Sequence, residues 1–154
     1  MSLLNRYFGF SEFIKSDTAK KLGINNEPDE EKTNNILQLM RMMDIFRERW
    51  TEYCEENGLG NPAIIITSGY RSEELNKAVG GSKTSAHRLG YACDFKAKNG
   101  LNKELFEVVE DTLKPLEFEE LIWEKGDKYN PAWIHFALFD SEGRQKREII
   151  RWRG

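Results

Sequence analysis

A long amphipathic segment in the first third of the chain is the strongest constraint on its fold. Apolar residues recur there every three or four positions from 36 to 53, which is the spacing of one face of an α-helix. Acidic residues at 29–31 stand where a first helical turn favours negative charge, and Asn57-Gly58 is a typical helix end. The rest of the chain must cover the apolar face of this helix. That face consists of Ile36, Leu39, Met40, Met43, Phe46, Trp50 and Tyr53.

After residue 60, short apolar runs rich in β-branched and aromatic residues replace the helical periodicity. Such runs are typical of strands, and Ser141-Glu142-Gly143 predicts a hairpin-type turn before the last of them. We expect that last run to be an edge strand. The predicted strands are residues 63–67, 92–97, 121–123, 133–139 and 148–152.

Three further helices are predicted from their end signals. Ser11 is a candidate cap for a helix that runs to about Leu22 and stops at Gly23. Ser72 caps a short helix through residue 79, and Asn102 caps one through residue 113. Helices followed by a mostly antiparallel sheet with one inserted helix predict an α+β fold.

Length and charge limit the classes of protein to which the chain can belong. At 154 residues we expect one domain, with a helical part at 1–60 and a sheet part at 61–154. A net charge of −3 offers no basic stripe, which argues against a nucleic-acid partner, and we expect a monomer. The longest apolar run, at 63–66, is too short to span a bilayer, so no membrane insertion is expected. Cys54 and Cys93 are expected to be reduced, half-buried thiols rather than a disulfide.

The two histidines and one aspartate indicate a metal site. His87 and Asp94 are joined by a short segment in which Gly90 permits a tight turn. His135 lies in an apolar strand, where an unpaired polar side chain is costly. Two imidazoles and a carboxylate make up the ligand count of a catalytic zinc, which predicts metal-dependent hydrolysis. The alternatives are a surface histidine at 87 and a hydrogen-bonded core histidine at 135.

Several motifs together resemble one known family. They are Ser68-Gly69-Tyr70-Arg71-Ser72, then Ser85-x-His87-x-x-Gly90-x-Ala92-x-Asp94-Phe95, and finally Trp133-x-His135. This set is similar to the M15 family of zinc peptidases, which are D-alanyl-D-alanine carboxypeptidases and phage-type peptidoglycan endopeptidases with the Hedgehog/DD-peptidase fold. The segment 8–26 is similar to the start of the short, phage-associated branch.

The resemblance implies a role for each matched residue. His87, Asp94 and His135 would be the zinc ligands. Arg71 would hold a substrate carboxylate or steady the oxyanion, and Ser85 would orient the substrate. The implied substrates are peptide stems of peptidoglycan or muropeptides. The first residues lack a secretory pattern, so we expect a protein that is cytoplasmic as synthesised and reaches the cell wall through lysis, a holin or a phage particle.

This chain has no acidic residue or histidine at the positions where the family that it resembles places its general base. Many members have an acidic residue three positions before the last ligand or a histidine two positions before it, and this chain has Ala132 and Trp133 there. We expect Glu124 to serve, with Asp127 or no protein group as the alternatives, and both carboxylates are also compatible with simple surface charges. The missing acid leaves open a catalytically silent, metal-stabilised module that binds cell-wall peptides. A zinc hydrolase for another peptide or amide is a third option.

Basic residues cluster near the end of the chain. We interpret them as a solvated patch that protects an edge strand, with contact to an anionic cell wall as the alternative. They are Arg144, Lys146, Arg147, Arg151 and Arg153.

Overall fold

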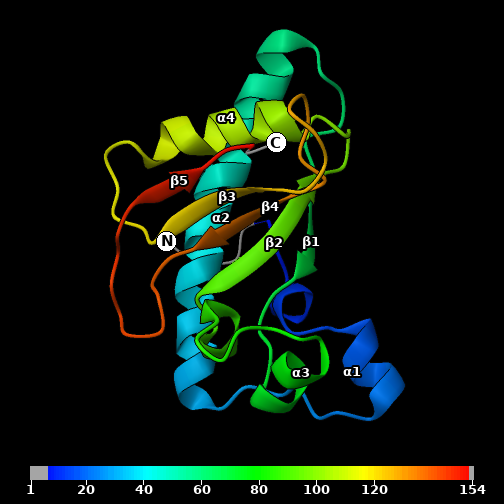
Figure 1. Cartoon of the computed structure of the whole chain (residues 1–154). Helices are drawn as coiled ribbons and strands as arrows, with labels where there is room; N and C mark the ends of the chain where they lie inside the picture. The colour runs from blue at the N-terminus through cyan, green and yellow to red at the C-terminus, as the bar shows by residue number, and fades with distance from the viewer. Residues whose placement is uncertain (1–6, 153–154) are drawn as a thin grey trace.

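The computed structural model describes residues 7–152, and its fold is α+β, as predicted. The two longest helices pack on one face of a five-stranded, mostly antiparallel sheet (Figure 1). In chain order the elements are η1 (Phe10–Phe13), α1 (Asp17–Leu22), α2 (Glu30–Asn57), β1 (Ile64–Ser68), α3 (Glu73–Ala78), η2 (Ala86–Leu89), β2 (Ala92–Ala97), α4 (Asn102–Leu113), β3 (Glu120–Glu124), β4 (Trp133–Ala137) and β5 (Glu148–Ile150), where η denotes a 3₁₀ helix.

The long helix α2 forms as predicted and carries much of the core. The Asp29 carboxylate accepts the Lys32 amide at 2.9 Å at its start, and Gly58 ends it with a left-handed backbone. Every predicted core position on this helix is buried except Tyr53, which is 37% exposed. The ring of Phe46 packs edge-on against Phe136 of β4, at 5.0 Å between centroids.

Two helix starts differ from the prediction. The segment 11–22 is broken into η1 and α1, because Ser16 is extended and its hydroxyl accepts the amide of Ala19. Asn102 is the first residue of α4 rather than its cap. Its side chain instead accepts the Ala97 amide and donates to the Pro131 carbonyl, so it ties two loops together.

The strand order is β1-β2-β4-β3-β5, and every neighbouring pair is antiparallel except β3 and β5. The turn at 141–143 exists, but the predicted hairpin is wrong because β3 lies between β4 and β5. β5 is a short edge strand that ends at residue 150. β3 extends one residue beyond the predicted run at each end, which brings Glu120 and Glu124 into the sheet.

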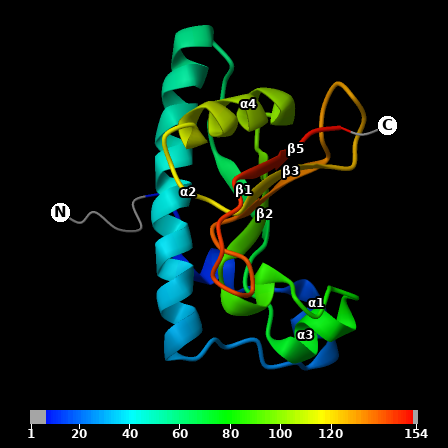
Figure 2. The same ribbon diagram turned by 60° about the vertical axis from the view of Figure 1, so that its left-hand side comes forward.

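The two faces of the sheet have different surroundings. α2 and α4 cover one face, and the segment with α3 and η2 lies on the other side at one end (Figure 2). Alternate residues of the central strands, such as Phe95 and Phe136, are fully buried in the core with the helices. The residues between them point to the opposite face. On that face Asp94 of β2, His135 of β4, Ile122 of β3 and Ile150 of β5 form one cross-strand row.

The structure also gives the burial of the two cysteines and the partners of the basic residues near the end of the chain. Cys54 and Cys93 are free thiols and are fully rather than half buried. The basic side chains that the structure describes are exposed to solvent, as predicted, and they also have partners. Arg151 pairs with Glu110, and Arg147 donates to the carbonyls of Leu116 and Lys114. Arg153 and the first six residues lie outside the described part of the chain, in which no helix is long and apolar enough to cross a membrane.

The turn before β2 has a specific requirement for glycine. Gly90 has a φ of +83°, and a Cβ there would lie 2.9 Å from both Ile36 Cγ1 and the Lys32 carbonyl of α2. We expect Gly90→Ala to lower the free energy of unfolding by about 3 kcal/mol, through left-handed strain and overpacking. Urea denaturation measures this.

Gly100→Ala is the matched control, because Gly100 has a φ of +82° with no atom within 4 Å of the added Cβ. We expect it to cost only about 1–2 kcal/mol. Equal losses in the two variants would contradict the packing role of Gly90.

Candidate metal centre

Three side chains predicted from the sequence come together at one end of the open sheet face. His87 comes from η2, Asp94 from β2 and His135 from β4, and one ligand atom from each lies within 4.8 Å of the other two. Asp94 and His135 are register partners, so their side chains leave the sheet on the same face. Asp94 Oδ1 is 2.9 Å from His135 Nδ1 and 3.5 Å from His87 Nε2.

The short helix η2 and its neighbours fix the orientation of His87. The Ser85 hydroxyl accepts the His87 amide at 3.2 Å, and the Arg71 amide donates to the His87 carbonyl. On the ring, Nδ1 contacts the Gly69 carbonyl at 2.8 Å. Since a carbonyl can only accept, Nδ1 carries a proton, and Nε2 is the ring nitrogen that faces Asp94. Gly69 makes this approach possible, because a Cβ there would lie 2.3 Å from the Phe13 carbonyl oxygen.

Glu120 orients His135 in a similar way, and the sequence analysis missed it. Its Oε1 lies 3.1 Å from His135 Nε2. A carboxylate on the distal ring nitrogen is a common partner of a metal-binding histidine, because it fixes the tautomer and raises the basicity of the other nitrogen. Strand alternation places Glu120, Ile122 and Glu124 on one face, and Ile122 pairs with His135. Finding Glu120 from the sequence required both this register and the true start of β3.

The cluster has a strong internal electrostatic field. Burial opposes charge on His135, but its hydrogen bonds to Asp94 and Glu120 outweigh burial and raise its pKa from 6.5 to about 9. Burial likewise acts to raise the pKa of Asp94, yet hydrogen bonds from His135 and His87 hold it well below its usual range. The hydrogen bond from His135 also lowers the pKa of Glu120. Without metal, His135 is therefore an imidazolium between two carboxylates at neutral pH.

Arg71 approaches Oδ2 of Asp94, whereas the two histidines approach Oδ1. Its Nη2 is 3.9 Å from Asp94 Oδ2, and its Nη1 donates to Asn76 Oδ1 at 3.3 Å. Burial lowers the pKa of Arg71, and the charge of Asp94 opposes this effect. Asn76 is in turn held by the Ser82 carbonyl at 2.9 Å. The guanidinium is thus a half-buried, oriented cation beside the cluster.

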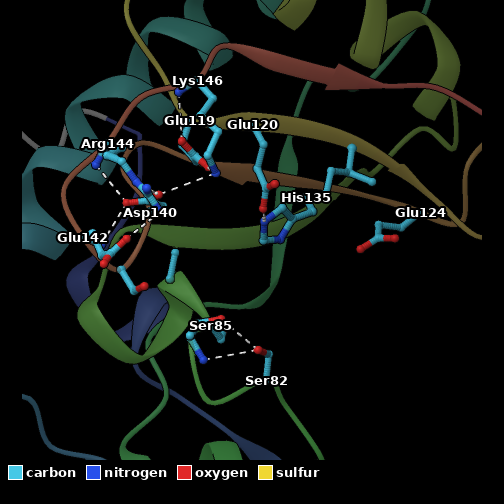
Figure 3. Close-up of a pocket in the computed structure, with 14 residues that line it drawn as sticks. Ser82, Ser85, Glu119, Glu120, Glu124, His135, Asp140, Glu142, Arg144 and Lys146 are labelled. Carbon is cyan, nitrogen blue, oxygen red and sulfur yellow. Dashed lines mark hydrogen bonds and ion pairs between the residues drawn. The ribbon is translucent and has the colours of Figure 1, made fainter.

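A pocket of about 600 Å³ opens over His135 (Figure 3). Ser85, Glu120 and Glu124 line it together with His135. Among the residues that the structure places, none forms a hydrogen bond or ion pair with the Glu124 carboxylate. Asp127 does not line this pocket. Its carboxylate instead accepts hydrogen bonds from the backbone amides of Tyr129 and Asn130, which stabilises a turn.

The residues of the cluster fit a tetrahedral divalent metal. Zinc ligands at about 2.0–2.1 Å in a tetrahedron stand about 3.3 Å from one another. The spacings of 2.9 and 3.5 Å to Asp94 Oδ1 bracket that value. Each imidazole has its distal nitrogen held by an acceptor, which leaves the nearer nitrogen for the metal once His135 loses a proton.

Comparison with known proteins agrees with this geometry. A family model described as peptidase M15 matches residues 6–136, a stretch that contains Arg71, His87, Asp94 and His135. A search of curated proteins finds no match.

The pKa of His135 predicts how the stability of the metal-free protein depends on pH. A group whose pKa is raised by folding stabilises fully below its unfolded pKa, and that stabilisation is lost as pH rises through its folded pKa. From pH 6.5 to about 9 we expect the free energy of unfolding to fall by on the order of 2–3 kcal/mol.

Chemical denaturation with a chelator present, at several pH values, measures this slope. His135→Gln removes the titrating group and should flatten it. A wild-type stability that is constant over this range would contradict the assigned charge state.

Proposed function

The chain belongs to the M15 peptidase family, and from this premise we propose that it is a zinc-dependent peptidase that hydrolyses peptide stems of peptidoglycan. The observation that carries the proposal is the set of His87, Asp94 and His135, which bring one ligand atom each within 4.8 Å of the other two beside the pocket that His135 lines. These three residues would hold the metal. A zinc ion there supplies Lewis acidity, which polarises a peptide carbonyl and makes a water molecule more acidic.

Arg71 is suited to oxyanion stabilisation or to holding a substrate carboxylate. Its guanidinium is fixed by Asn76 and lies beside Asp94, so it is oriented before substrate binds. A preorganised cation in a partly buried site stabilises developing negative charge more than a solvated one does. Ser85 caps η2 and also lines the pocket, where its hydroxyl can orient a substrate backbone.

Glu124 is our candidate for the general base, and Glu120 positions His135. Glu124 lines the pocket with a carboxylate that has no hydrogen-bonding partner among residues 7–152, so it is available to accept a proton. Glu120 is occupied by His135 and Asp127 by its own turn. Many family members have an acidic residue at the position of Ala132, and a free carboxylate in the pocket can replace it.

The substrate class rests on the family resemblance rather than on the pocket. We propose that the protein acts on cell-wall stem peptides after release by lysis, a holin or a phage particle. Ala132 favours a second candidate, a metal-stabilised module that binds such peptides without cutting them. A zinc-loaded protein that binds stem peptides and leaves them intact would establish that second function.

Metal loading and its loss test the proposal directly. We expect the zinc-loaded chain to cleave stem peptides and the chelated chain to be inactive. His87→Ala should lower kcat/KM by about 10³ or more, because a missing ligand removes several kcal/mol of transition-state stabilisation. Mass spectrometry of the products measures this. Full activity of the metal-free chain would contradict the proposal.

Two glutamates on one strand face provide a matched pair of isosteric variants. Glu124→Gln should lower kcat by about 10²–10⁴ while leaving zinc affinity unchanged, because a base is lost but no ligand is disturbed. Glu120→Gln should weaken zinc binding by about 10–100-fold, because His135 loses its orienting carboxylate.

Calorimetric zinc titration and steady-state kinetics separate the two effects. Activity of the Glu120→Gln variant should return when zinc is in excess. An active Glu124→Gln variant would exclude Glu124 as the base.

A further inference from the structure

The pocket continues on both sides of the candidate metal centre. In Figure 3, His135 lies between a group of charged side chains, which includes Asp140 and Arg144, and Glu124 at the far side. The candidate reaction centre therefore lies partway along the hollow rather than at its end. A site that removes one terminal residue needs space for only that residue beyond the scissile bond.

Within residues 7–152, the charged side of the pocket contains no cation that is free to receive a terminal carboxylate. Arg144 contacts Asp140 and Glu142 at 2.8 and 2.6 Å. Lys146 contacts Glu119 at 2.8 Å and Asp140 at 3.5 Å. Each of these cations is already shared between two carboxylates, so the field on this wall disfavours another anion.

On the other side, Glu124 and Ile122 also line a second hollow of about 380 Å³. Ile150 and Trp152 form much of its apolar wall, and Trp152 is 39% exposed. The segment is anchored, because Arg151 pairs with Glu110 and lies over the Phe106 ring. The row from His135 through Ile122 to Ile150 places this hollow on the same sheet face as the metal centre, and Ile122 lines both hollows.

We infer that the hollow formed by Ile122, Ile150 and Trp152 is a substrate subsite and that the protein is an endopeptidase. This inference rests on the proposed peptidase function. A peptide chain would lie across the sheet face, with residues on one side of the scissile bond against Trp152. Residues on the other side would lie in the charged part of the pocket. The two shared residues, Ile122 and Glu124, are the reason for assigning the hollow to substrate.

The reaction consumes one water molecule for each internal amide bond. The C–N bond breaks, the water oxygen becomes part of a new carboxylate, and both water protons end on the leaving nitrogen, which becomes an ammonium group. The products are two peptides, one with a new carboxyl terminus and one with a new amino terminus. An endopeptidase therefore does not require a free carboxylate near the bond that it cleaves.

The first test compares two forms of one synthetic stem peptide, with a free or an amidated carboxyl terminus, on the zinc-loaded full chain. We expect both to be cut at the same internal bond with comparable kcat/KM, as measured by mass spectrometry. Release of only the last residue, abolished by amidation, would overturn the inference and leave the proposed peptidase function standing. No cleavage of either form would overturn both.

The second test addresses the subsite. We expect Trp152→Ala to lower kcat/KM about three- to tenfold for a long peptide, the usual worth of one aromatic contact. We also expect a dependence on peptide length. When the peptide is shortened stepwise from one end, the difference between Trp152→Ala and the wild type should disappear, and shortening from the other end should leave it unchanged. Trp152→Phe should recover part of the loss. Tyr129→Ala is the matched control, since Tyr129 is 70% exposed and lines neither hollow.

An unchanged kcat/KM in Trp152→Ala would overturn the subsite. A loss confined to substrates that carry glycan would assign the hollow to a sugar, and a change in oligomeric state would assign it to a second copy of the chain. Either result would also overturn the inference.

Discussion

The hydrogen bond between Asp94 and His135 is the interaction on which the candidate site depends. It joins register partners on β2 and β4, so the sheet itself sets its length. Each partner carries a further contact that fixes its environment: His87 reaches Asp94 from η2, and Glu120 reaches His135 from β3. If β4 slipped by one residue against β2, His135 would turn into the core with the helices, and the ligand set would be lost.

The rest of the fold supports this pairing. α2 and α4 bury the opposite face of the sheet, and Gly90 lets η2 approach α2 closely enough to place His87 over β2. Gly69 brings the β1 end against Phe13 and presents its carbonyl to His87. The cost of burying three polar side chains is offset because each has partners on more than one element.

The sequence predicted the elements with strong local signals and the residues with distinctive chemistry. The periodicity of α2, the runs of β1 and β2, and the set of His87, Asp94 and His135 were all accessible, because helix period and ligand chemistry are local properties. The hairpin before β5 was wrong because strand order depends on non-local pairing. Glu120 was missed for a related reason. Its role depends on which residue of β3 faces His135, and that register is set by the whole sheet.

The central claim is that two imidazoles and one carboxylate hold a zinc ion on the open face of the sheet. X-ray absorption at the zinc edge of the loaded full chain tests it most directly, because it reports the ligand atoms themselves. The account predicts two imidazole nitrogens and oxygen ligands at about 2.0–2.2 Å, with no sulfur. Cys93 precedes Asp94 but is buried in the core. A sulfur ligand at about 2.3 Å, or a shell without imidazole, would contradict the account.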